Sequence, residues 1–221
     1  MASEQKVRSS YHHGDLKEAL LTAAESILAE EGVTGLTLRA CARKAGVSHA
    51  APKHHFKDAA DLLAEVAARS FDKLTDTLRE ERTASADLDP EARIVGVFRA
   101  YVSFARCYPD HFRLMFRWKE IDRENETLRA ASARTYAEMT SSVTIQRGAT
   151  DVTAETLYER LSEPGLLDDV IPAWSQIHGY AILLLEGQFD GFVLNEGGGE
   201  DAFVERTVQE TGARLSRMLR S

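Results

Sequence analysis

Hydrophobic residues recur with helical spacing from the first part of the chain onward. Between residues 15 and 32 the apolar positions are 16, 19, 20, 23, 24, 27 and 28, which lie on one stripe of an α-helix. Asp15 is a candidate N-cap and Gly32 a candidate stop. The pattern predicts an amphipathic helix over residues 15–32.

A second, shorter helix is predicted soon after the first. Thr37 can cap a helix over residues 38–45, because its hydroxyl can accept a hydrogen bond from an amide of the first turn. Gly46 would end this helix, since glycine adopts the left-handed backbone that closes many helices.

Two more helices follow. Ser48 can cap a third helix that runs to about Phe56, with Pro52 in the first turn, where most amides have no intrahelical partner. From Asp58 a long fourth helix is predicted, because residues 62–78 are again amphipathic. The second and third helices, joined by a turn of about three residues, predict a helix-turn-helix unit.

The remainder of the chain also has helical periodicity, without convincing strands or internal repeats. We therefore predict an all-α protein with a three-helix helix-turn-helix head (residues 11–72) and a larger helical body (residues 73–221). The helices of the body are expected near residues 90–107, 109–119, 123–148, 166–190 and 200–219.

Charge is distributed unevenly along the chain. The 221 residues have a formal net charge of −8, which argues at first against a nucleic-acid partner. Residues 1–60, however, carry eight Lys/Arg and seven Asp/Glu, whereas residues 61–221 carry 19 and 28. Residues 37–57 contain five basic residues and no acid. This basic window could be a solvated face, or a DNA-binding face if the helix-turn-helix prediction holds.

Composition indicates an ordinary globular protein of the cytoplasm. Hydrophobic residues make up 43% and charged residues 28%. The chain has two cysteines, Cys41 and Cys107, which suggest a reducing compartment. No apolar run approaches the roughly 20 residues that span a bilayer, and the N-terminus lacks the apolar segment of a signal peptide. No membrane partner is expected.

Three histidines in the stretch 47-VSHAAPKHHF-56 raise the question of a metal site. His54 and His55 are adjacent, so on a helix they point about 100° apart, whereas a helical zinc pair prefers residues i and i+4. Asp58 is the only carboxylate near them in the sequence. We therefore predict no metal site from His49, His54 and His55.

Catalytic motifs are also missing from the sequence. We find no GxSxG, and Gly197–Gly199 lacks the lysine and hydroxyl of a phosphate-binding loop. Cys41 falls on the apolar side of its helix and is expected in the core. We therefore predict neither an enzyme nor a cofactor.

Residues 14–67 resemble the N-terminal domain of the TetR family of bacterial transcriptional regulators. The resemblance rests on the leading amphipathic helix, the E-G-x-x-G-L-T-L-R turn, A-x-x-A-G-V-S and the terminal H-F at positions 55 and 56. More weakly, 108-YPDHFRLMF-116 and 174-WSQIHG-179 resemble a subgroup with a W-x-x-x-H-G signature in its C-terminal domain.

The resemblance implies a homodimer that binds a palindromic operator on double-stranded DNA. His49 would contact a base edge, Ala50 or Ala51 a thymine methyl, and Ser48 would lie beside them at the groove. His55 and Phe56 would pack inside the head, and an arm around Lys6, Arg8 and Tyr11–His13 would add backbone contacts. The phosphate contacts would come from Thr37, Arg39, Lys53, His54 and Lys57.

Two residues depart from the family pattern. Lys53 stands where the family commonly has a tyrosine, and a lysine reaches a phosphate as a point charge without ring packing. Ala59 stands where the family often has a phosphate-binding lysine, a role that Lys57 is close enough to take. DNA binding is expected to persist with altered details.

The resemblance also implies a pocket for an unknown small-molecule effector in the body, whose binding releases the operator. Aromatic residues at helical spacing are equally compatible with an ordinary core, and His178 could be either a polar group in the pocket or a core histidine. Gly179 would let another helix approach closely. The pocket candidates are Phe98, Tyr101, Phe104, Met115, Phe116, Tyr136, Trp174 and His178.

Two functions are therefore compatible with the sequence. The first is a ligand-responsive transcriptional regulator, by resemblance a repressor. The second is a helical small-molecule-binding protein or enzyme whose basic window is incidental. A DNA titration separates them, because the first predicts a strong, salt-dependent preference for one palindrome.

Overall fold

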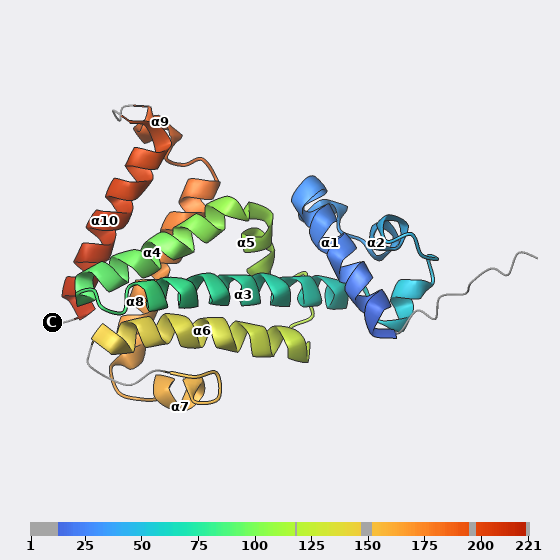
Figure 1. Cartoon of the computed structure of the whole chain (residues 1–221), viewed down its shortest axis with the longest axis horizontal. Coiled ribbons are helices and arrows are strands. Elements are labelled where there is room, and N and C mark those ends of the chain that lie inside the picture. The colour runs from blue at the N-terminus through green and yellow to red at the C-terminus, as the bar shows by residue number, and fades with distance from the viewer. Residues whose placement is uncertain (1–12, 118, 147–151, 195–197, 220–221) are drawn as a thin grey trace, which may run out of the picture.

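The computed structural model describes residues 13–117, 119–146, 152–194 and 198–219, and every regular element in these ranges is helical (Figure 1). The all-α prediction is confirmed. The elements are α1 (His13–Gly35), α2 (Leu38–Lys44), the 3₁₀ helix η1 (Ala51–His54), α3 (Ala59–Ala84), α4 (Pro90–Cys107), α5 (Pro109–Met115), α6 (Glu126–Gln146), α7 (Leu157–Leu161), α8 (Leu166–Leu185), α9 (Asp190–Val193) and α10 (Gly199–Leu219).

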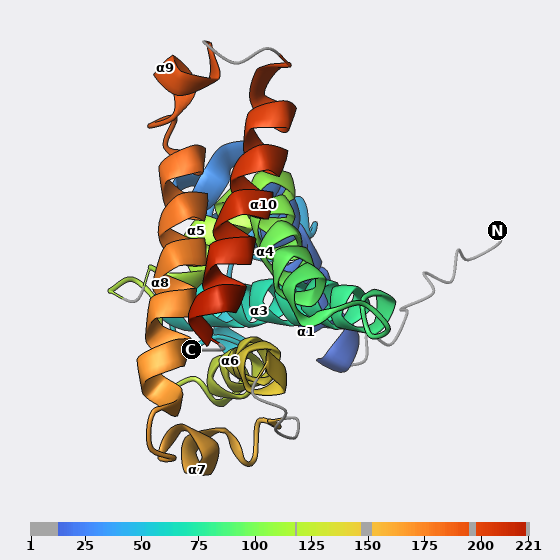
Figure 2. The same ribbon diagram turned by 90° about the vertical axis from the view of Figure 1, so that its left-hand side faces the viewer.

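Helix α3 is the axis of the molecule. Figure 1 shows α1 and α2 gathered around its N-terminal end as a head, while α4, α6, α8 and α10 lie around the rest of it as a body. In the turned view, α8 and α10 both lie on the face of the body that points away from the head (Figure 2). A helix-turn-helix head on a larger helical body is thus confirmed.

The start of α3 is fixed by two reciprocal side-chain contacts. Asp58 accepts a hydrogen bond from the backbone amide of Asp61 (3.0 Å), and the Asp61 carboxylate accepts one from the amide of Lys57 (2.9 Å). These bonds satisfy amides that have no partner within the helix. They also hold the backbone of Lys57 at the entrance of α3.

Head and body share α3. Its buried face includes Leu62 and Val66 near the head and Phe71 and Leu74 further along. The predicted domain boundary between residues 72 and 73 lies inside this helix. The two parts are therefore joined by a continuous helix and a continuous hydrophobic core.

The C-terminal helix packs very closely on α4. A Cβ atom added to Gly212 of α10 would lie 2.9 Å from the Cα atom of Val95, which is closer than side chains normally approach a backbone. Glycine at this position therefore allows the close contact between α10 and α4.

Several predicted helix ends were wrong. Helix α1 begins at His13, so Asp15 lies inside its first turn. The predicted stop at Gly32 is confirmed, because the backbone leaves the helical conformation there (φ 69°, ψ −173°) before a short second stretch that ends at Gly35. In the body, α5 ends at Met115 instead of residue 119. Helix α8 ends at Leu185, and α7 was not predicted.

Candidate DNA-binding surface and effector pocket

Helix α2 forms the first half of the helix-turn-helix. The hydroxyl of the exposed Thr37 accepts a hydrogen bond from the amide of Ala40 (3.1 Å), which confirms the predicted N-cap. Cys41 is fully buried, as predicted, and burial raises the pKa of its thiol to about 11. Gly46, with φ 69°, makes the turn that follows.

Residues 48–56, the second half of the helix-turn-helix and here called the recognition segment, contain only the short 3₁₀ helix η1. The prediction of a longer helix capped by Ser48 was therefore wrong. Most backbone hydrogen bonds of the segment have the i+3 pattern: the amide of Ala51 donates to the carbonyl of Ser48 (3.0 Å) and that of Lys53 to Ala50 (3.2 Å). One i+4 bond closes the segment, from the amide of Phe56 to the carbonyl of Pro52 (2.9 Å). Pro52 does lie in the first turn, as predicted. Because proline has no amide hydrogen, it removes one of the few bonds that an α-helix this short could form.

Side chains of this segment divide into an outer and an inner set. Phe56 is buried, and the ring of the half-buried His55 meets it edge-on with centroids 6.5 Å apart. Ala51 is half-buried. The candidate DNA contacts Ser48, His49, Ala50, Lys53 and His54 are all exposed.

Basic residues around the helix-turn-helix differ in their pairing. Lys44 binds Glu30 (2.6 Å) within the head, and Lys57 lies 3.6 Å from the carboxylate of Asp122 in the body. Arg39, Arg43 and Lys53 are exposed and form no ion pair within the described residues. Arg43 was not among the predicted contacts, although its place in the basic window pointed to it.

The histidines are not assembled into a metal site. Across the ranges that the structure describes, no three His, Cys, Asp or Glu side chains are grouped closely enough to hold an ion. None of the described helices is long and apolar enough to cross a membrane. The predicted arm at Lys6, Arg8 and Tyr11 lies outside the described residues, and His13 is the first residue of α1.

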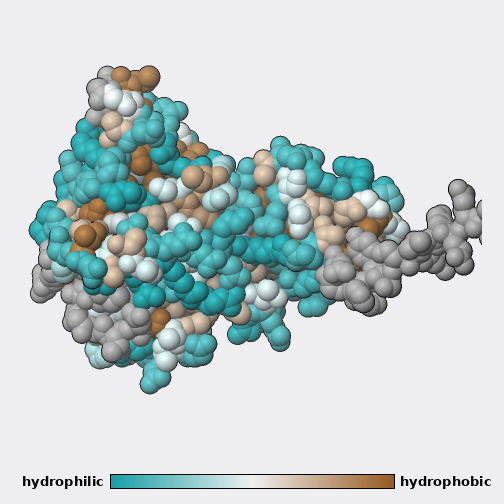
Figure 3. Space-filling model, viewed as in Figure 1, coloured by the Kyte–Doolittle hydropathy of each residue, from teal (hydrophilic) through white to brown (hydrophobic). Residues whose placement is uncertain are grey.

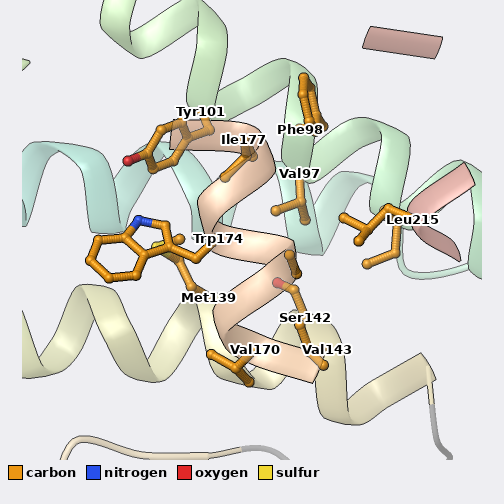
Figure 4. A pocket seen from close by; sticks show the side chains of 12 residues that line it. Val97, Phe98, Tyr101, Met139, Ser142, Val143, Val170, Trp174, Ile177 and Leu215 are labelled. Carbon is orange, nitrogen blue, oxygen red and sulfur yellow. The ribbon is translucent and has the colours of Figure 1, made fainter. Parts of the chain in front are cut away.

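A pocket lies in the body between α4, α6, α8 and α10 (Figure 4). The cavity itself has a volume of about 40 Å³ and lies within a wider hollow of about 450 Å³ that includes open solvent. Of the described residues that line it, none is charged. The lining residues are Ile94, Val97, Phe98, Tyr101, Met139, Ser142, Val143, Val170, Ala173, Trp174, Ile177 and Leu215.

Three of the eight pocket candidates, Phe98, Tyr101 and Trp174, line this pocket. The others do not line it. Phe116, Tyr136 and His178 surround the Trp174 ring, with centroids 6.4, 5.5 and 5.8 Å from it. The remaining candidates, Phe104 and Met115, are buried in the core.

The aliphatic lining residues were missed. They come from four helices, and in the sequence their spacing is the same as that of ordinary core residues. Only the way in which these four helices pack against one another distinguishes the lining positions from the rest of the core.

Tyr101 and His178 form the polar contact beside the pocket. The Tyr101 hydroxyl lies 3.0 Å from Nδ1 of His178, a residue of α8. Burial raises the pKa of Tyr101 and lowers that of His178. Both groups are therefore neutral at pH 7, and Figure 4 shows the indole nitrogen of Trp174 on the edge of its ring that faces Tyr101.

A polar cluster joins head to body beside α3. Asn125 at the start of α6 donates hydrogen bonds to Asp61 (2.8 Å) and Glu65 (3.2 Å), and all three are at most 9% exposed. Lys17 of α1 lies 3.0 Å from Glu65, and the Thr127 hydroxyl donates to the same carboxylate (3.1 Å). The cluster connects α1, α3 and α6.

Known proteins share this architecture. Residues 20–66 match the family described as bacterial regulatory proteins, tetR family, and residues 94–211 match the tetracyclin repressor-like C-terminal domain. Among curated proteins, none matches the chain.

Two solved structures are similar over almost the whole length. A protein of unknown function from Rhodococcus sp. RHA1 is 31% identical, with a TM-score of 0.71 over 97% of this chain and 100% of that one. The TetR family transcriptional regulator PfmR from Thermus thermophilus is 16% identical, with a TM-score of 0.54 over 90% and 97%. By its family matches in both head and body, the chain belongs to the TetR family of bacterial transcriptional regulators.

Proposed function

We propose that this regulator binds a near-palindromic operator as a homodimer, represses transcription in the cytoplasm, and releases the operator when a neutral, apolar small molecule enters the body. The observation that most directly supports DNA binding is a set of exposed side chains on the helix-turn-helix: His49, Lys53, Arg39 and Arg43. The proposal includes no catalytic step. The signature at Trp174, His178 and Gly179 further suggests the W-x-x-x-H-G subgroup.

The head supports both kinds of DNA contact. His49 and Ala50 stand exposed at the start of the recognition segment, where base edges are read. Arg39, Arg43 and Lys53 have no carboxylate partner in the described part of the chain and can bind phosphates without breaking an ion pair there. In a dimer the two heads would enter successive major grooves about 34–36 Å apart.

Helix α8 supports the dimer. Its outer face exposes Leu167, Ile171 and Leu183 at 46%, 48% and 44%, apolar surface that a second copy would cover. A Cβ added to Gly179 would meet no atom of the described residues within 4 Å, so a second copy can approach the helix there. Figure 3 shows further hydrophobic surface at the α9 end of the body and along α10.

Pocket chemistry supports an uncharged effector. An ionised group would lose its hydration in this lining and find no opposite charge among the described lining residues, which costs several kcal/mol or more. Ser142, Trp174 and the hydroxyl of Tyr101 offer the few polar atoms, and the other lining residues are hydrocarbon or thioether. A compact, neutral hydrophobic molecule fits this lining.

Selection of operator DNA from a random library, followed by titration at several salt concentrations, tests the DNA half. We expect one near-palindrome, preferred about 10³-fold or more over unrelated DNA, with affinity that falls steeply with salt. Weak and equal binding to all sequences would refute the proposal and favour a helical small-molecule-binding protein or enzyme.

Two substitutions test the placement of the head. Lys53→Ala should weaken binding to all sequences and make it less salt-dependent, whereas His49→Ala should relax the preference at one base position. Arg93→Ala is the matched control, since Arg93 lies in the first turn of α4. Figure 1 shows that α4 begins at the end of the body far from the head. If neither head variant differs from the control, the recognition segment has been placed wrongly.

Fluorescence of Trp174 tests the effector half. In a Trp118→Phe background, matched neutral and charged analogues are titrated and the emission of Trp174 is followed. Neutral apolar compounds should change the emission and weaken operator binding, while their ionised analogues should do neither. Preferential binding of the ionised compounds would contradict the assigned effector class.

A further inference from the structure

The segment between α5 and α6 reaches from the body to the entrance of α3 in the head. The backbone amide of Asp122 donates a hydrogen bond to the carbonyl of Ala60 (3.1 Å), in the first turn of α3. This bond holds Asp122 beside the point where the chain passes from the recognition segment into α3.

The carboxylate of Asp122 faces in two directions. Its Oδ1 atom accepts a hydrogen bond from the amide of Glu124 (3.0 Å), which closes a local turn. Its Oδ2 atom lies 3.6 Å from Nζ of Lys57. The side chain of Asp122 is 25% exposed and that of Lys57 is 78% exposed, so the carboxylate is anchored and the lysine is free to move.

Lys57 is also well placed for DNA. Its backbone amide is held by Asp61, while its long side chain projects into solvent directly after the recognition segment. Among the described basic residues at 37–57 it is the one that pairs with an acid of the body, since the partner of Lys44 is Glu30 in α1.

We propose that Asp122 competes with operator phosphate for Lys57, so that the body limits how tightly the head holds DNA. The inference rests on the proposed operator binding. A phosphate that approaches Lys57 must displace the Asp122 carboxylate or share the ammonium group with it, and the two anions repel each other. An exposed ion pair of this kind is weak, which makes it a modest brake that DNA can overcome.

The test compares Asp122→Asn with the unchanged chain on the selected operator. Asparagine keeps an oxygen for the turn with Glu124 and removes the charge that faces Lys57. We expect operator binding to become about two- to fivefold tighter per head, the range that corresponds to an exposed ion pair. Asp122→Ser, whose hydroxyl can also accept from the Glu124 amide, gives the same test if the asparagine variant folds poorly.

Glu124→Gln is the matched control. It removes one negative charge two residues away, from a side chain that is 85% exposed and pairs with Arg129 instead of Lys57. We expect Glu124→Gln to bind as the unchanged chain does. In a Lys57→Gln background, Asp122→Asn should no longer tighten binding, because the residue that it frees is absent.

Three results would overturn the inference: equal gains from Asp122→Asn and Glu124→Gln, weaker binding by Asp122→Asn, or a gain that persists without Lys57. Failure of the proposed function is distinguishable from these. In that case the unchanged chain would show no operator preference, and this is measured before any variant is compared.

Discussion

The side-chain amide of Asn125 donates a hydrogen bond to the buried carboxylate of Asp61, with 2.8 Å between nitrogen and oxygen. Its carbonyl oxygen accepts from the amide of Leu128 (2.9 Å) and so caps α6. One residue thus starts a helix of the body and binds the first turn of the shared helix α3.

Asn125→Asp should destabilise the whole protein. Aspartate keeps the cap of α6, but it replaces a donor with a third carboxylate beside Asp61 and Glu65, both less than 10% exposed. A buried charge that loses its donor typically costs about 1–3 kcal/mol or more. Urea unfolding measures the loss. Thr127→Val, which removes only a partly buried donor to Glu65, should cost less.

His111 should make stability depend on pH. Its Nδ1 atom lies 2.9 Å from the hydroxyl of Ser70, and burial, assisted by the charge of Lys73, lowers its pKa below the ordinary value of 6.5. The unfolded chain then binds a proton more readily than the folded one, so this contribution is present above pH 6.5 and is lost as the pH falls below it.

Unfolding free energies measured between pH 5 and 8 check this expectation. His111→Gln should lower stability at pH 8, where it disturbs the contact with Ser70, and should also flatten the decline toward pH 5. If the unfolding free energy of His111→Gln fell as steeply toward pH 5 as that of the unchanged chain, groups other than His111 would be responsible for the pH dependence. His178, whose pKa burial also lowers, is expected to add to the remaining slope.

The two cysteines should react at very different rates. Cys41 is fully buried, and burial raises its pKa to about 11, so its thiolate is scarce and shielded, whereas Cys107 is exposed. Brief maleimide treatment followed by mass spectrometry should find one modified thiol in the folded protein and two after denaturation. In Cys107→Ser, labelling without denaturant should almost vanish; rapid labelling would show that Cys41 is accessible.

Ile171→Glu should separate the proposed dimer. A symmetric interface meets each substitution twice, so two buried glutamates would lie in the contact. Sedimentation should show a shift toward monomer and about tenfold or greater weakening of association, equal to about 1.4 kcal/mol. Leu88→Glu, at a leucine 53% exposed between α3 and α4, should leave the association unchanged. Equal behaviour of the two variants would place the interface elsewhere.

Local signals in the sequence were enough to predict most of the helices of the head. Thr37, Asp58 and the apolar stripe of α1 act on neighbouring residues, so their effects can be read from spacing alone. The length and type of the helix in the recognition segment were predicted wrongly. A four-residue helix has few hydrogen bonds, and Pro52 changes the balance between i+3 and i+4 backbone hydrogen bonds.

Contacts across the fold could not be predicted in this way. Asn125 meets Asp61 across 64 positions and Lys57 meets Asp122 across 65, and neither pair leaves a periodic trace in the sequence. The aliphatic side of the pocket, such as Val97 and Leu215, looks the same as any other part of a core until the helices are placed.

The shared helix α3 has a consequence for engineering sensors from this protein. A chimera that joins this head to the helical body of another regulator must either cut α3 or replace the residues that pack against it. Lys17 and Glu65 would then face whatever residues stand at the positions of Asn125 and Thr127. Grafts that carry residues 119–128 along with the head should tolerate the exchange better than grafts cut at the end of the family's DNA-binding domain at residue 66.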